Sequence, residues 1–222
     1  MGIKLVFKTI IIFWLIAFFN GPAYGDFFVS PRVSTLGLGA DLGYEINPNF
    51  KTRLNFNYFT YSHSTTFEDV RYDADLTLTT FGALLDYHPL GGGFRLSAGA
   101  YYNNNNVDLD GRVSPSITFE IGDNIYKGEE IGKLKGDFDF NDFAPYVGLG
   151  WGADYGTDRN WHFAFDLGVM YQGSPNVSLR AENPQNIAEL DRDISREISD
   201  IESDIDRYRW YPVLALGITY RF

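Results

Sequence analysis

Charged side chains recur at every second position in several segments whose intervening residues are small or apolar. The set that shares the face opposite the apolar one consists of Asp41, Glu45, Arg53, Arg95, Tyr146, Asp154, His162, Asp166 and Arg221. Charges gathered in a narrow space must pair with one another or stay hydrated. Two uses follow for this set. One is a salt-bridged structural interior, and the other is a narrow path for small cations, which the excess of carboxylates would favour.

A second candidate site surrounds His63, which lies between Ser62 and Ser64 and close in sequence to Asp73 and Asp75. A Ser, His and Asp group works only when the three side chains are within hydrogen-bond reach of one another. The sequence gives no sign of that reach, and chance proximity is the better explanation. We therefore predict no catalytic residue and no enzyme.

A third group of residues could bind a hard cation, because such ions take carboxylate oxygens as ligands. Its members are Asp108, Asp110, Asp137, Asp139 and Asp142. The stretch VDLDG lacks the remainder of an EF-hand loop, so we expect a solvated acidic surface, or divalent ions that bridge it to the phosphate groups of a partner. No GxGxxG, P-loop, CxxC or HExxH motif is present, and we predict neither a cofactor nor a metal site.

The element that organises the chain is its last stretch, YRWYPVLALGITYRF at 208–222, which alternates with a period of two. One face is wholly apolar with aromatic residues at both ends: Trp210, Pro212, Leu214, Leu216, Ile218, Tyr220 and Phe222. The other face is small or polar and includes Arg221. An apolar band flanked by aromatic girdles is typical of a strand that faces lipid on one side and a lumen on the other.

Residues 1–25 predict a secretory signal peptide, followed by a single domain over 26–222. Lys4 and Lys8 precede the apolar run TIIIFWLIAFF, and small residues lead to a plausible cleavage site before Asp26. The apolar run of 11 residues is too short to span a hydrocarbon core of about 30 Å.

The remaining chain is acidic, because it keeps 16 of the 18 Lys and Arg residues and all 29 Asp and Glu residues, a net charge of −13. Such a charge excludes nucleic acid as a partner. No later stretch approaches the length of about 20 apolar residues that a transmembrane helix needs. A membrane-spanning form of this chain must therefore be a closed barrel.

Six further segments alternate in the same way. Together with the closing stretch they give seven expected strands, at 35–46, 51–63, 72–88, 94–109, 143–154, 161–171 and 208–222. The pattern becomes ambiguous after Thr79, which suggests a β-bulge. Short turns at 47–49, 89–93 and 156–160 alternate with long polar loops at 62–71, 111–142 and 173–207. Single-chain bacterial barrels have an even number of strands, so residues 26–33 must supply an eighth strand despite Pro31, or else thread the lumen as a plug.

These features together resemble the small outer-membrane barrels typified by the transmembrane domain of outer membrane protein A and by the opacity-type surface antigens. The resemblance implies an outer-membrane location and contact with outer-membrane lipid and lipopolysaccharide. It also implies that the closing strand is an assembly signal read by the barrel-assembly machinery, carried by Trp210, Leu216, Ile218, Tyr220 and Phe222. No peptidoglycan-binding domain follows the barrel in this sequence, so a tether to the cell wall is not expected.

An amphipathic helix is expected over 183–207, in the last long loop. Asn183 would cap it and Pro184 would occupy its first turn. Its apolar stripe consists of Ile187, Leu190, Ile194, Ile198, Ile201 and Ile205. The other faces are mostly acidic, so an anionic membrane surface would repel the helix and the stripe needs a protein partner. We expect it to fold over the barrel mouth against Phe138 and Phe140; the alternative is a mobile or self-associating surface helix.

The expected fold is therefore an all-β, antiparallel meander barrel of eight transmembrane strands with one helix in an extracellular loop. The expected function is a structural or surface-interaction role in the bacterial outer membrane. A narrow porin for small cationic solutes is the alternative, and a lipid-modifying enzyme ranks third.

Overall fold

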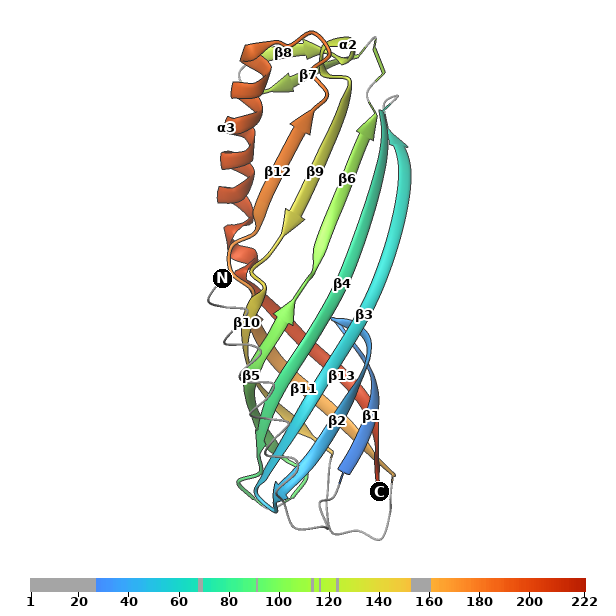
Figure 1. The fold of residues 1–222 in the computed structure, drawn as a ribbon, viewed down its shortest axis with the longest axis vertical. Coiled ribbons are helices and arrows are strands. Elements are labelled where there is room, and N and C mark those ends of the chain that lie inside the picture. The colour runs from blue at the N-terminus through green and yellow to red at the C-terminus, as the bar shows by residue number, and fades with distance from the viewer. Residues whose placement is uncertain are drawn as a thin grey trace.

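The structure is a computed structural model that describes residues 27–67, 70–90, 92–112, 114–115, 117–122, 124–152 and 161–222. Eight antiparallel strands form a closed barrel in the lower half of Figure 1. In order around the barrel they are β1 (Phe27–Ser34), β2 (Gly37–Asn47), β3 (Phe50–Phe67), β4 (Val70–Tyr87), β5 (Arg95–Asn103), β10 (Phe143–Trp151), β11 (Trp161–Tyr171) and β13 (Trp210–Arg221). The predicted eight-stranded meander is confirmed. Among the described residues, no helix is long and apolar enough to cross a bilayer.

The first strand is β1, so residues 27–34 belong to the wall and do not plug the lumen. β1 pairs with β2 without interruption through Pro31, which lies opposite Ala40. Its pairing with β13 is broken at Ser30 and Pro31 and resumes from Arg32 to Ser34. Proline has no N–H to donate, and the break confines this loss to one side of the strand.

Side chains alternate between the two faces of the wall as the period of two predicts. In β13, Leu214, Leu216 and Ile218 are exposed outward, whereas Val213, Ala215 and Thr219 are buried inside. Aromatic pairs lie at both ends of the apolar band: Phe27 with Tyr44 and Trp161 with Tyr220 below, and Tyr171 with Trp210 above. The ten residue-to-residue steps from Trp210 to Tyr220 span about 33 Å of strand, which a tilt of about 40° reduces to about 25 Å, the height of a lipid-facing band.

The hairpin of β3 and β4 continues far above the barrel, so the prediction of a polar loop at 62–71 is wrong. Its register is unbroken from Phe50 opposite Tyr87 to Phe67 opposite Val70, and the β-bulge expected after Thr79 is absent. What changes near Thr79 is the other neighbour of β4. Residues 80–87 pair with β5, and residues 71–77 pair with β6 (Asn106–Arg112). Different surroundings for the two halves of β4 explain its ambiguous pattern.

A second unit, here called the upper sheet, continues the wall above the barrel (Figure 1). It consists of β12 (Asn176–Ala181), β9 (Lys133–Asp139), β6 and the upper halves of β4 and β3, in that order. The segment 111–142, expected to be a long polar loop, thus supplies a strand to this sheet and a separate hairpin at its top. The hairpin is formed by β7 (Thr118–Ile121) and β8 (Asn124–Lys127), which is followed by the one-turn helix α2 (Gly128–Ile131).

The predicted helix is α3 (Ala188–Ile205), followed by the 3-10 helix η1 (Asp206–Arg209). It begins later than predicted, because residues 183–187 form a turn in which the Asn183 side chain accepts a hydrogen bond from the Ile187 N–H. Asn183 and Asn186 both have positive φ, so neither continues into the helix.

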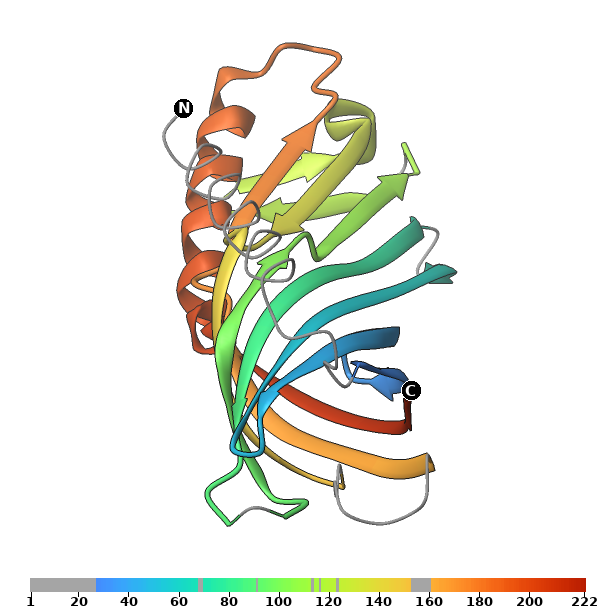
Figure 2. The same cartoon turned by 60° about the horizontal axis from the view of Figure 1, so that its bottom comes forward.

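The apolar stripe of α3 has a protein partner, but the predicted site of docking is wrong. The helix runs along the long axis of the molecule beside β12 and does not cover the barrel mouth (Figures 1 and 2). Leu190 and Ile194 join a buried cluster with Tyr126 and Ile131, and the partly buried residues against it are Phe119, Ile121, Leu134, Leu179, Ala181, Ile187 and Ile198. The expected partners Phe138 and Phe140 are not in this cluster.

Candidate functional site: the ion-paired lumen

The middle of the barrel is filled by six buried charged side chains from six different strands. They are Arg32 of β1, Asp41 of β2, Arg53 of β3, Asp86 of β4, Arg95 of β5 and Asp166 of β11. Each is on the inward face of its strand, because the alternation that points apolar residues to the outside points these residues to the lumen. Three positive and three negative charges balance one another at this level.

Arg53 is the centre of this network. Its guanidinium lies 3.0 Å from Asp41 Oδ2, 2.6 Å from Asp86 Oδ2 and 3.4 Å from Asp166 Oδ2. Arg32 contacts both Asp41, at 2.7 Å, and Asp166. Arg95 Nη2 lies 2.7 Å from Asp166 Oδ1. Every carboxylate therefore meets at least one arginine, which is the condition under which buried charge is tolerated.

Neutral polar residues supply further hydrogen bonds to the carboxylates. Ser97 Oγ donates to Asp86 at 2.5 Å, and Asn55 Nδ2 donates to Asp41 at 2.6 Å. Asn57 donates to Asn55 and to Thr80, which extends the network upward. Multiple partners for each buried carboxylate fix the positions of the side chains and strengthen the network.

Above the ion pairs, an apolar and aromatic layer closes the upper lumen. It consists of Leu36, Leu84, Tyr101, Ala144, Tyr146, Met170 and Val213. The Tyr101 and Tyr146 rings meet edge to face with centroids 5.5 Å apart. Gly148 and Gly168 leave the space that the Tyr146 hydroxyl fills, since a Cβ at either would lie 2.3 Å from it. Leu36, in the tight turn between β1 and β2, also points into this layer.

Below the ion pairs, Phe28, Lys51 and His88 are buried near the lower end of the barrel. Lys51 Nζ lies 4.0 Å from Glu45 Oε2. A Cβ at Gly43 would lie 1.9 Å from the Phe28 ring, so only glycine leaves room for this ring. The void lined by Phe28, Lys51, His88 and the central charges measures about 10 Å³. That volume is at the limit for one water molecule.

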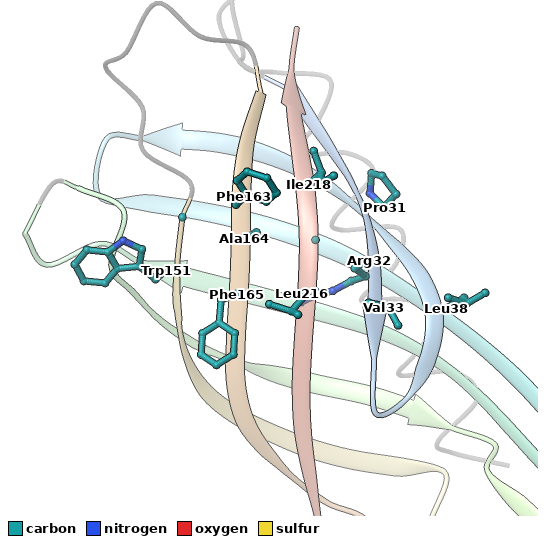
Figure 3. Close-up of a pocket in the computed structure, with 12 residues that line it drawn as sticks. Pro31, Arg32, Val33, Leu38, Trp151, Phe163, Ala164, Phe165, Leu216 and Ile218 are labelled. Atoms are coloured by element: carbon teal, nitrogen blue, oxygen red, sulfur yellow. The ribbon is translucent and has the colours of Figure 1, made fainter.

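A much larger hollow, of about 610 Å³, lies on the outside of the wall. Val33, Leu38, Phe163, Phe165, Leu216 and Ile218 line it across β1, β2, β11 and β13 (Figure 3). Its lining is almost wholly apolar and it belongs to the lipid-facing band. It is therefore a groove between lipid-facing side chains, and Arg32 of the central ion network is one of the few polar residues that line it.

The structure brings together four of the eight charged residues selected from the sequence: Asp41, Arg53, Arg95 and Asp166. Glu45 is in the lower layer with Lys51, and Arg221 is half-buried at the lower end of β13. His162 lies on β11 opposite Thr219, four residues below Asp166. Asp154 falls outside the described residues.

Sequence reasoning missed Arg32 and Asp86. Strand parity identifies both only if residues 27–34 are a strand and β4 has no bulge after Thr79, and the sequence pattern fixes neither condition. With these two residues added, the central layer has three arginines and three aspartates. The excess of carboxylates that would favour cations is therefore not found in this layer.

The His63 group does not assemble. Ser62 and Ser64 lie opposite Asp75 and Asp73 on one face of the β3–β4 hairpin, while His63 lies opposite Ala74 on the other face. His63 instead stacks on Tyr61 with ring centroids 6.2 Å apart. Among the described residues, no group of His, Asp or Glu is arranged to hold a metal ion.

No protein-family model matches the chain, and no curated protein matches it. Among solved structures, CarO2 of Acinetobacter baumannii is 27% identical with a TM-score of 0.59, over 89% of this chain and 98% of that chain. CarO of the same species is 26% identical with a TM-score of 0.57, over 88% of this chain and 97% of that chain. These neighbours are eight-stranded barrels of the bacterial outer membrane.

Proposed function

Since this chain is a small eight-stranded β-barrel of the bacterial outer membrane, we propose that it is a closed scaffold that displays a folded extracellular platform for contacts at the cell surface. The platform consists of the upper sheet, the β7–β8 hairpin and α3. The observation that carries the proposal is the filled lumen, in which a balanced ion network lies beneath an apolar layer.

The energetics of the lumen support a closed state. A path through the centre would have to part Arg53 from three carboxylates, and leaving one member of a buried ion pair unpartnered costs about 3–5 kcal/mol. An eight-stranded barrel is just wide enough for its own side chains to fill. Solute transport is therefore the weaker candidate.

The platform has a core of its own, which supports a role outside the membrane. The buried cluster of Tyr126, Ile131, Leu190 and Ile194 joins the hairpin, α2 and α3. Tyr126 and Asn124 donate hydrogen bonds of 2.7 Å to the buried Asp193 carboxylate. Such packing gives a surface of fixed shape, which suits recognition better than a loose loop does.

Three molecular partners follow from the same proposal. The apolar band contacts outer-membrane lipid, and the aromatic residues at its upper end lie at the level of lipopolysaccharide. The closing strand, with Phe222 and Tyr220, is read by the barrel-assembly machinery. Nucleic acid is excluded by the net charge of −11 for the whole sequence.

Planar-bilayer recording tests the closed scaffold. We expect the purified chain to give no steady conductance under conditions in which a general porin conducts. Steady single-channel currents from the wild-type chain would overturn the proposal in favour of the channel. An Asp166→Asn variant would then assign the current to the lumen if its ion selectivity changed.

A further inference from the structure

One edge of the upper sheet is open. β2 ends its pairing with β3 at Leu38 opposite Tyr58, and beyond that point β3 pairs with β4 alone. The edge from Phe59 to Phe67, here called the β3 edge, therefore faces outward with no described strand beside it (Figure 1). The side chains from Tyr58 to Thr65 are all exposed, on both faces of the strand.

The opposite edge of the same sheet is covered. α3 packs along β12, and the Val177 N–H of β12 donates to the Glu202 carboxylate of the helix at 3.3 Å. Natural sheets guard a free edge with charge, proline, a bulge or a covering element. The β3 edge, FTYSHSTTF, contains no Lys, Arg, Asp, Glu or Pro, and its register with β4 has no bulge.

The two faces beside the β3 edge differ in chemistry. On one face Ser62 is followed across the sheet by Asp75, Asp108 and Asp137, each directly opposite the next. On the other face Phe59 and Tyr61 are exposed, and Leu76 and Val107 follow Tyr61 across the sheet.

The acidic face also carries cations on the strands far from the β3 edge, where Arg180 lies opposite Lys135 and Arg112 lies opposite Lys133. Lys135 lies 3.6 Å from Asp110, but Asp108 and Asp137 stand side by side. Partial burial and the neighbouring Asp108 raise the pKa of Asp137. The carboxylates closest to the β3 edge are Asp75 and Asp73 of β4, opposite Ser62 and Ser64, so a basic side chain on a strand added to this edge would be separated from them by one strand only.

We propose that the β3 edge binds an extended segment of a partner protein as an additional strand, and that this segment alternates basic with aromatic or β-branched residues. Its backbone would pair with the free groups of β3. Its basic side chains would extend the acidic face, and its apolar side chains would pack beside Phe59 and Tyr61. The inference rests on the proposed surface role and names the partner's chemistry.

A second copy of this chain is a poorer fit. The β3 edge of a second copy offers no basic residue to the acidic face. Two copies in one membrane also direct their β3 strands the same way, so the pair would have to be parallel, which is the slightly less stable arrangement.

The test uses the full chain folded in detergent micelles and a fluorescent peptide of about nine residues in which lysine alternates with valine or tyrosine. We expect saturable binding and slower amide hydrogen exchange at alternate residues of the β3 edge. A peptide with the same sequence but with every second amide N-methylated should bind at least about tenfold more weakly, because it cannot donate to β3. Absence of binding, or equal binding of the methylated peptide, overturns the proposal.

Matched variants separate strand addition from general attraction to an acidic protein. Ser62→Lys puts a positive charge at the β3 edge, and Ser178→Lys puts the same charge on β12, on the same face. We expect Ser62→Lys to weaken binding about tenfold and Ser178→Lys to change it less than about threefold. Equal effects overturn the proposal. The result is independent of conductance, so a failed edge and a failed scaffold are distinguishable.

Discussion

At the scale of single residues, the lumen depends most on Arg53, whose guanidinium lies within ion-pair distance of three aspartates from three other strands. Its side chain is only 3% exposed. Water cannot replace the guanidinium at such a site, so its removal leaves carboxylates without compensation.

We predict that Arg53→Met destabilises the barrel by about 3–5 kcal/mol, although methionine fills a similar volume. The measurement is the urea midpoint of unfolding, followed by the change in gel mobility between folded and unfolded barrel. Arg192→Met is the control, because Arg192 forms a comparable 3.0 Å pair with Glu189 on the exposed surface of α3. Its cost should be below about 1 kcal/mol. Equal midpoints for the two variants would contradict the assigned role of Arg53.

The pH dependence of the platform depends on Asp193. Hydrogen bonds from Asn124 and then Tyr126 hold the pKa of Asp193 below its usual value of about 3.9. The Asp193 carboxylate therefore stabilises the packing of the β7–β8 hairpin on α3 fully above that value. This stabilisation is lost as the pH falls through the lower pKa of Asp193 in the folded state. Burial, and then Asp193, raise the pKa of Tyr126 to about 12, so its hydroxyl keeps its proton at neutral pH.

We predict that acidification from pH 7 to about pH 3 loosens the β7–β8 hairpin from α3. Spin labels at the exposed Lys127 and Ser195 would report a broader distance distribution at low pH. Asp193→Asn should give the same distribution at both pH values, whereas Asp200→Asn, at an exposed position of α3, should keep the wild-type response. An unchanged pH response in Asp193→Asn would refute this assignment.

Several residue-level assignments followed from strand parity alone, because a period of two fixes the face of every side chain once the strand is identified. Asp41, Arg53, Arg95 and Asp166 were found in this way. Distances between strands are not encoded in any local pattern, so the central position of Arg53 could not be derived from the sequence. The separation of His63 from Ser62 and Ser64 follows from strand parity, but only once residues 62–67 are known to be strand and not loop.

At the scale of elements, an exposed apolar side chain faces lipid on one strand and water on another. Leu216 of β13 is 60% exposed and Ile125 of β8 is 72% exposed. Leu216 lies in the apolar band between the two aromatic girdles, where lipid is the solvent. Ile125 lies in the hairpin at the top of the platform, where water is the solvent.

We predict that Leu216→Arg costs about 2–4 kcal/mol, because it places a charge near the middle of the bilayer. Ile125→Arg should change stability by less than about 0.5 kcal/mol. Both are measured as the free energy of unfolding in lipid vesicles. Equal effects would mean that the outer face of β13 does not face lipid.

Element boundaries were predictable where hydrophobic alternation meets a turn, as in β2, β11 and β13. They were not predictable where an element leaves the membrane, because the pattern then loses its lipid face. The polar residues after Tyr61 were therefore assigned to a loop, although backbone pairing with β4 continues the strand. The helix was recognisable from its stripe, but the choice between Phe138 and the β7–β8 hairpin as its partner is a tertiary one.

At the scale of the whole molecule, charge is segregated. The central lumen layer is balanced, whereas the acidic excess of the chain is prominent on the upper sheet and α3.

The barrel is closed at a single seam, in which β13 pairs with β1 and the Phe222 N–H donates to the Phe27 carbonyl at 3.1 Å.

We predict that Phe222→Ser reduces the fraction of chain assembled in the outer membrane severalfold. The residue is 73% exposed at the lower aromatic girdle, where it meets Tyr220 edge to face at 5.2 Å. Tyr208→Ser, at an exposed aromatic of η1, is the control and should assemble normally. Normal assembly of Phe222→Ser would remove the closing strand from its proposed role as the assembly signal.

The seam also sets the order of folding. In the barrel, β1 pairs with β2, β2 with β3 and β3 with β4 across short connections, whereas β1 and β13 are separated by almost the entire described chain. The entropy lost in closing a loop grows with its length, and contacts between distant segments form slowly. We therefore expect the hairpins to form early and the ring to close last, so that every intermediate exposes two unpaired edges, one of which contains Pro31.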